Sequence, residues 1–192
     1  MRLLRGDDLT KLCQIDEQLL RQSLQDFPTQ SYDFRLAWVP DEATMAWHHA
    51  REDFLSLELL GKVPEVKGAL VESESGQPTW CIWSRSFSKK HSENVLYILR
   101  IVIDSDANSS RHVDPKRVQQ VVECLSAAQE QAEIWGMSSV DLWNPSPTIL
   151  AGCNQLDPEA RIIHRDRESI TCLNWYGEQH KKQNESAISF PK

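Results

Sequence analysis

The run Val95–Ile103 constrains the fold more than any other feature of the sequence. It is apolar on both faces apart from Arg100, as expected of a strand that helices cover on each side. A helix that begins after Asp114 and ends at Gly136 follows it, and 138–143 is again strand-like. Because strands joined by a helix pair in parallel through a right-handed crossover, we expect 95–103 and 138–143 to lie side by side.

Two further segments before this run have the composition of strands. Lys67–Glu74 and Thr79–Phe87 are rich in β-branched and aromatic residues, with a turn-forming segment between them. Together with the strand at 94–104 they predict an antiparallel meander. Trp80 and Trp83 fall on opposite faces of the second strand, so one is expected in the core while the other could line a groove. The sequence therefore predicts an α/β fold whose sheet is antiparallel at its start and parallel at its centre.

The other elements follow from apolar periodicity and from stop signals. We expect helices at about 8–24, 41–60 and 148–155, a strand at 34–39, and a closing strand pair at 161–164 and 170–175. The leucine-rich face of the first helix suits docking either on its own domain or on a partner. The expected organisation is an N-terminal helical arm (1–30), one domain (31–177) and a polar C-terminal tail (178–192).

Charge and cysteine content exclude several classes of function. The 21 Lys and Arg against 28 Asp and Glu give a net charge of −7, which disfavours nucleic acids and acidic membranes as partners. The five cysteines form no Cys-x-x-Cys pair, so we expect reduced thiols and neither a disulfide framework nor a zinc knuckle. The first residues lack a secretory signal, and no stretch of 18 apolar residues occurs. These features predict a cytoplasmic protein.

Four strings carry a resemblance to a known family: WHHAREDF at 47–54, EVKGA at 65–69, LYILR at 96–100 and LWNPSP at 142–147. With the order of elements from about 34 to 176, they resemble the GCN5-related N-acetyltransferase (GNAT) superfamily, and in particular a fungal branch related to lysine N-acetyltransferases. The resemblance implies a GNAT-like mixed sheet whose central parallel strands splay apart to hold acetyl-CoA. It also implies acetyl transfer to a small amine such as lysine, and it is compatible with a homo-oligomer.

The resemblance also implies roles for individual residues. The pantetheine arm would run along Leu99, Arg100 and Ile101 and meet the side chain of Asn144. Ser109, Ser110, Arg111 and His112 would approach the phosphates. The candidates for proton transfer are the phenols of Tyr97 and Tyr176 and the carboxylate of Glu168.

Each of these residues also has a purely structural interpretation. Arg100 suits a partnered buried charge, and Tyr97, which would share a strand face with Leu99 and Ile101, suits core packing. Glu168 suits an ion pair in a turn, Asn144 suits a turn start after a strand, and 109–112 suits a solvated loop.

Two departures from the family pattern favour an alternative function. The segment Asp104–Pro115 contains no glycine, whereas the family binds pyrophosphate with a turn that resembles Arg/Gln-x-x-Gly-x-Gly/Ala. The segment Thr148–Gln155 contains no tyrosine, although a tyrosine is often the proton donor there. The alternative is a degenerate GNAT-fold domain that serves as a binding or interaction module. A hydrolase or isomerase ranks last, because no supporting motif occurs.

Two histidines of the helix at 41–60 complete the candidates. His48 lies one turn from Glu52, and His49 lies one turn from Asp53, but the sequence supplies no clear third metal ligand. We therefore expect no metal site. In the resembled fold this helix passes near the acceptor pocket, so a role in binding the acceptor stays open.

Overall fold

A five-stranded mixed sheet organises residues 1–160 in the computed structural model, which describes residues 1–25, 37–72, 78–103 and 113–163. The strands run in sequence order across the sheet; β1 to β4 pair antiparallel with one another, whereas β4 and β5 pair in parallel. The elements are β1 (Arg2–Arg5), α1 (Gly6–Gln25), α2 (Glu42–Leu60), β2 (Val66–Val71), β3 (Thr79–Ser86), a short 3-10 helix (His91–Glu93), β4 (Val95–Ile103), α3 (Pro115–Ile134), β5 (Ser139–Leu142) and α4 (Pro147–Leu156).

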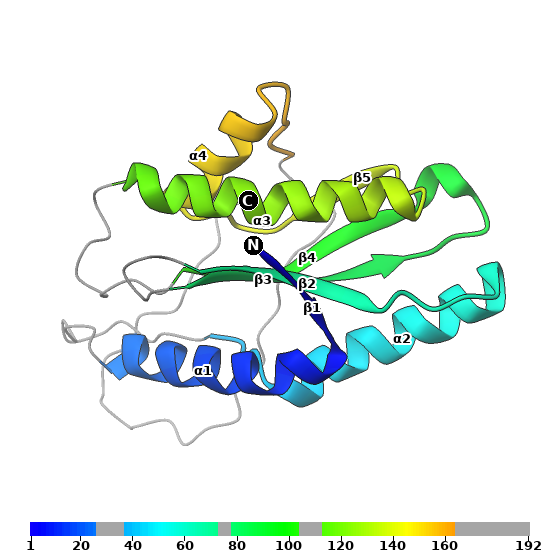
Figure 1. Cartoon of the computed structure of the whole chain (residues 1–192), viewed down its shortest axis with the longest axis horizontal. Coiled ribbons are helices and arrows are strands. Elements are labelled where there is room, and N and C mark those ends of the chain that lie inside the picture. The colour runs from blue at the N-terminus through cyan, green and yellow to red at the C-terminus, as the bar shows by residue number, and fades with distance from the viewer. Residues whose placement is uncertain (26–36, 73–77, 104–112, 164–192) are drawn as a thin grey trace, which may run out of the picture. The chain divides into compact units, whose positions relative to one another are not determined.

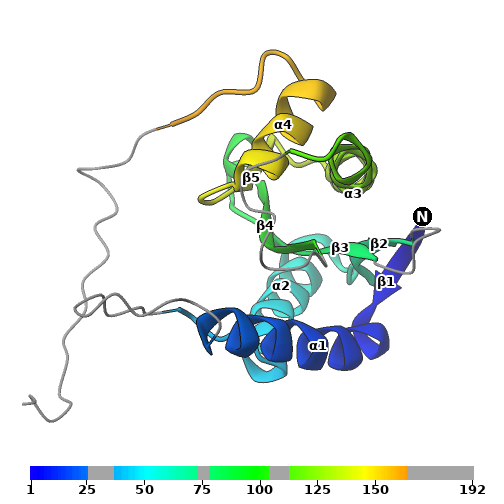
Figure 2. The same cartoon turned by 90° about the vertical axis from the view of Figure 1, so that its left-hand side faces the viewer.

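Helices cover both faces of the sheet (Figure 1), as the apolar character of β4 predicts. Figure 2 shows α1 and α2 on one face and α3 and α4 on the other. Each face has its own apolar cluster, and buried residues of β2, β3 and β4 contribute to both. The expected mixed α/β architecture is therefore confirmed.

The two central strands pair in parallel over a short length only. Val95–Ile98 of β4 is in register with Ser139–Leu142 of β5. In the described part of the chain, Arg100–Ile103 then pairs with β3 alone. The parallel pairing thus ends at Ile98, where β5 itself ends, and the second half of β4 has no neighbour in the described chain on the β5 side.

The N-terminal segment joins this sheet. β1, which the sequence pattern did not predict, pairs with β2, and its Leu4 is fully buried. Leu9, Leu12 and Cys13 of α1 pack into the same cluster as Trp80 of β3. The question of where the first helix docks is therefore answered: it packs on its own domain.

Two expected strands differ from the structure or lie partly outside it. Residues 37–39 and 161–163 have no regular secondary structure, although both belong to segments expected to be strands. The remaining parts of these two strands, and the whole of the third expected strand at 170–175, lie outside the described residues. Trp80 and Trp83 lie on opposite sheet faces as expected, but both are core residues and neither lines a groove.

Candidate functional site

A cavity of about 430 Å³ lies where the pairing of β4 with β5 ends. Its size falls in the range of small-molecule sites. Tyr97, Ile98 and Leu99 of β4 form one wall, and Trp143, which directly follows β5, forms another. β3 contributes its last residues, Ser84–Ser86, and α2 covers the cavity with the side chains described below.

A β-bulge in β4 shapes this wall. Trp83 of β3 is opposite Ile98, but the preceding residue, Ile82, is opposite Arg100, so Leu99 is an extra residue in β4. One extra residue reverses the facing of every residue that follows. Leu99 therefore joins the cluster on the α1 face, whereas Ile101 packs into the cluster under α3. The expectation that Tyr97, Leu99 and Ile101 share one face is wrong for this reason.

Three side chains of α2 line the cavity: those of Trp47, His48 and Arg51. The helix begins at Asp41, whose carboxylate accepts a 2.7 Å hydrogen bond from the N–H of Thr44. Positions three and four residues apart lie on the same face of a helix, so Arg51 lies beside both Trp47 and His48. Trp47 is 63% exposed and Trp143 is 56% exposed, so both indoles present apolar surface to solvent at the cavity.

His48 is held from two sides. Its ring meets the Trp47 ring edge-on, with centroids 4.9 Å apart, and its carbonyl accepts a hydrogen bond of 3.4 Å from the hydroxyl of Ser84. Burial lowers the pKa of His48, and the nearby charge of Arg51 lowers it further. Its imidazole is therefore neutral at neutral pH and has a nitrogen that can accept a proton.

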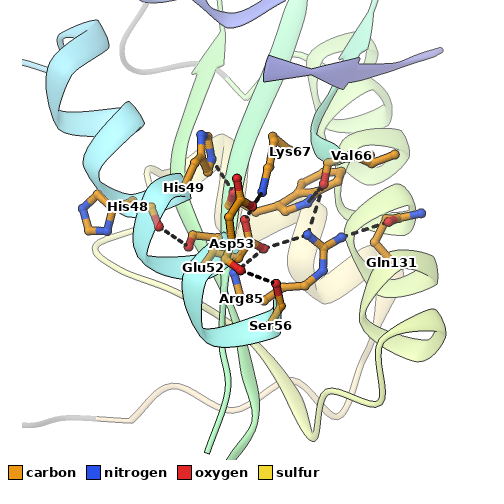
Figure 3. A network of polar contacts seen from close by, with 11 residues as sticks. His48, His49, Glu52, Asp53, Ser56, Val66, Lys67, Arg85 and Gln131 are labelled. Atoms are coloured by element: carbon orange, nitrogen blue, oxygen red, sulfur yellow. Dashed lines mark hydrogen bonds and ion pairs between the residues drawn. The ribbon is translucent and has the colours of Figure 1, made fainter. Parts of the chain in front are cut away.

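A buried network of charges supports this part of α2 (Figure 3). Glu52 is fully buried, and its carboxylate accepts hydrogen bonds from Lys67 at 2.7 Å and from the guanidinium of Arg85 at 2.8 Å. The same carboxylate accepts the backbone N–H of Arg85 at 2.9 Å, beyond the point where β2 stops pairing with β3. Glu52 thus satisfies a strand N–H that has no partner in β2. Lys67 also contacts Asp53.

Arg85 connects this network to the other side of the sheet. Its guanidinium donates to Gln131 of α3 at 2.9 Å and to the carbonyl of Val66 at 3.1 Å, and it lies over the ring of Trp135. On the α2 side, His49 donates from Nε2 to the carbonyl of Trp83 at 3.0 Å. These contacts fix α2 against β3, so they fix the helix that covers the cavity.

The structure places the sequence-predicted residues in different surroundings. Tyr97 and Leu99 line the cavity together, whereas Ile101 is on the opposite face. Arg100 makes a two-point ion pair with Asp16 of α1, with both contacts at 2.7 Å. Asn144 is exposed next to Trp143 and has a positive φ of 46°, which asparagine tolerates better than most residues. Ser109, Ser110, Arg111, His112, Glu168 and Tyr176 lie outside the described residues.

Sequence reasoning missed most of the cavity lining, including its three residues Trp47, Arg51 and Trp143. All three belong to the strings that carry the family resemblance, which was the available signal. Within the described ranges, no group of three or more His, Cys, Asp or Glu side chains is placed to hold a metal ion. The carboxylates of Glu52 and Asp53 contact cationic side chains instead.

Together, the mixed sheet, the parallel pair of β4 and β5 and the helices on both faces are those of the GNAT fold class. Comparison with family models gives a match over residues 1–189 to the family described as LYC1 GNAT-like C-terminal domain. The chain belongs to this family, and membership indicates chemistry of the acetyltransferase type.

Comparison with other proteins adds one remote similarity. A search of curated proteins found no match. Among solved structures, the chain is similar to a point mutant of TTHA1254 from Thermus thermophilus, with 12% identity and a TM-score of 0.39. The similarity covers 64% of this chain and 88% of that one. Among the helices of the described ranges, none has both the length and the apolar composition needed to cross a membrane.

Proposed function

We propose that this domain transfers the acetyl group of acetyl-CoA to a small amine such as lysine, with the amine bound in the cavity under α2. The observation that carries the proposal is the position of this cavity where the parallel pairing of β4 with β5 ends. Beyond Ile98, the edge of β4 that faces β5 has no strand partner in the described chain. Its peptide groups are thus available to hydrogen-bond an extended ligand such as pantetheine.

Aromatic walls of the cavity can hold an amine, although the guanidinium groups of Arg51 and Arg85 in the same lining oppose its positive charge. Trp47, Trp143 and Tyr97 supply aromatic rings, and an ammonium group over such a ring gains about 0.5–2 kcal/mol, depending on its desolvation. The reaction needs the ammonium to lose a proton before its nitrogen attacks the thioester carbonyl. A C–N bond then forms and the C–S bond breaks. The hydroxyl of Tyr97 is a candidate to protonate the departing thiolate.

A second candidate function is a binding module without catalysis. The segment Asp104–Pro115 lacks the glycines that normally let backbone amides approach a pyrophosphate. The family description, GNAT-like, is compatible with a domain that retains the fold alone. In this alternative the cavity binds an amine-bearing ligand and no acetyl group is transferred.

Two measurements on the full chain separate these functions. Calorimetry with acetyl-CoA and a thiol-release assay with lysine, spermidine and phenethylamine test binding and transfer. We expect saturable acetyl-CoA binding and release of CoA that depends on the amine. A module would bind an amine without releasing CoA. Absence of acetyl-CoA binding at millimolar concentration would contradict the transferase proposal.

A matched pair of variants tests the location of the site. Trp143→Ala removes a wall of the cavity and should raise the KM for the amine about tenfold, which corresponds to about 1.4 kcal/mol of lost binding. Trp38→Ala removes an indole that is 85% exposed and does not line the cavity, and it should leave the KM unchanged. Equal effects of the two variants would place the amine elsewhere.

A further inference from the structure

We infer that His48 is the general base of the acetyl transfer, which takes the proton of the incoming ammonium at the cavity. This inference rests on the proposed function, and it assigns to one side chain a step that the function requires. His48 lines the cavity with Tyr97 and Leu99, where the amine would meet the thioester at the end of the β4–β5 pairing. No candidate base was identified on α2 from the sequence.

The other titratable groups around His48 are poorer bases. Arg51 on the same helix and Arg85 from β3 carry guanidinium groups, which have no lone pair to receive a proton. Tyr97 from β4 brings a hydroxyl, which suits donation to the thiolate. Asp141 of β5 is the pairing partner of Tyr97 and shares its sheet face, but it does not line the cavity. Its carboxylate is the alternative base that the experiment must test.

His49, the adjacent histidine, is excluded by its contacts. It is buried, and its Nε2 donates to the carbonyl of Trp83 in the sheet. It also does not line the cavity. His48 has no such bond to its ring in the described chain, and only its ring edge contact with Trp47 orients it. Its lowered pKa supports the role, because a neutral imidazole is ready to accept a proton at neutral pH.

Atoms and charge balance in this transfer. One proton of the ammonium moves to the imidazole of His48, and the freed lone pair attacks the thioester carbonyl. The C–N bond forms, the C–S bond breaks, and a second proton of the nitrogen reaches the CoA thiolate. The imidazolium of His48 returns its proton to solvent. The products are one amide, one CoA thiol and one released proton.

The test is the pH profile of kcat/KM for lysine and acetyl-CoA with the full chain. The wild-type profile should include an acid limb in which activity rises as His48 loses its proton. His48→Gln should lower kcat/KM at pH 7 by about 10²- to 10⁴-fold and lose this limb. His48→Ala should regain activity on addition of imidazole. His91→Gln, an exposed histidine outside the cavity, should behave as the wild type.

The possible outcomes separate this inference from the proposed function. Transfer by the wild type with an unchanged acid limb in His48→Gln would overturn the role of His48 and leave the function standing. Loss of the limb in Asp141→Asn instead of His48→Gln would assign the base to Asp141. If the wild type transferred acetyl to none of the three amines, both the role of His48 and the proposed function would be overturned. A second readout is the NMR signal of the His48 ring, which should shift on saturation with lysine alone.

Discussion

At the scale of single residues, the buried carboxylate of Glu52 joins side chains from two strands. It accepts hydrogen bonds from the ammonium group of Lys67 in β2 and from both the guanidinium and the backbone N–H of Arg85 in β3. A buried ion pair need not add net stability, because desolvation of both charges opposes their attraction. Removal of one partner is costly, however, because the other is left charged in a dry environment.

Glu52→Gln should therefore be strongly destabilising. Arg85 would lose its anion, and Lys67 would retain only Asp53. We expect the free energy of unfolding, measured by urea titration, to fall by about 3–5 kcal/mol. The matched control is Glu17→Gln in the exposed pair with Arg21, which should change it by less than about 1 kcal/mol. Equal effects of the two substitutions would contradict this view of the network.

Buried histidines make stability depend on pH in a defined direction. Burial lowers the pKa of His49 and of His48, so the unfolded state binds more protons than the folded state. Their contribution is complete above the ordinary histidine pKa, and it is lost as pH falls through that value toward the lowered folded values. Asp8 and Asp41 also have lowered pKa values, and their contributions are lost only at more acidic pH, below the ordinary aspartate range.

We expect the urea midpoint to fall between pH 7 and pH 5 in the wild type. His49→Gln retains an N–H donor for the carbonyl of Trp83 but does not titrate, so it should flatten this dependence. Urea titrations at several pH values provide the measurement. An unchanged slope in His49→Gln would show that other groups cause the dependence.

At the scale of elements, α3 and α4 meet at Gly152. A Cβ added at this position would lie 2.6 Å from Cγ1 of Val121, so the two helices approach closely only because the residue is glycine. Gly152→Ala should overpack this contact and reduce the free energy of unfolding by about 1–3 kcal/mol. The measurement is a double-mutant cycle with Val121→Ala. The double variant should lose less free energy of unfolding than the two single variants lose in sum. Strict additivity would contradict the steric explanation.

Caps and crossovers could be predicted from the sequence, whereas the bulge could not. Asp114 and Gly61 mark helix ends through well-defined side-chain and backbone preferences, and both mark helix ends in the structure. The bulge at Leu99 left no signal, because β4 is apolar on both faces and a shift by one residue changes no hydrophobic pattern. β1 was missed for a related reason: it is four residues long, and only Leu4 is buried.

At the scale of the whole molecule, the cavity depends on which face of α2 packs toward β4. The residues of β4 at the cavity, Tyr97 and Leu99, were predicted because the resemblance locates the splay. Trp47 and Arg51 were not predicted, because packing determines which face of α2 is turned toward β4. Apolar residues occur around this helix, and Trp47 and Phe54 remain exposed while Met45 is buried. The pattern of α2 therefore does not reveal its inner face.

The most direct test of the central claim is ¹⁹F NMR of the full chain labelled with 5-fluorotryptophan. The sequence has seven tryptophans, and Trp47→Phe and Trp143→Phe assign the two signals of the cavity. We expect lysine and acetyl-CoA each to shift these two signals saturably, while the signals of the buried Trp80 and Trp83 stay in place. Unchanged Trp47 and Trp143 signals at saturating concentrations of both ligands would contradict this claim.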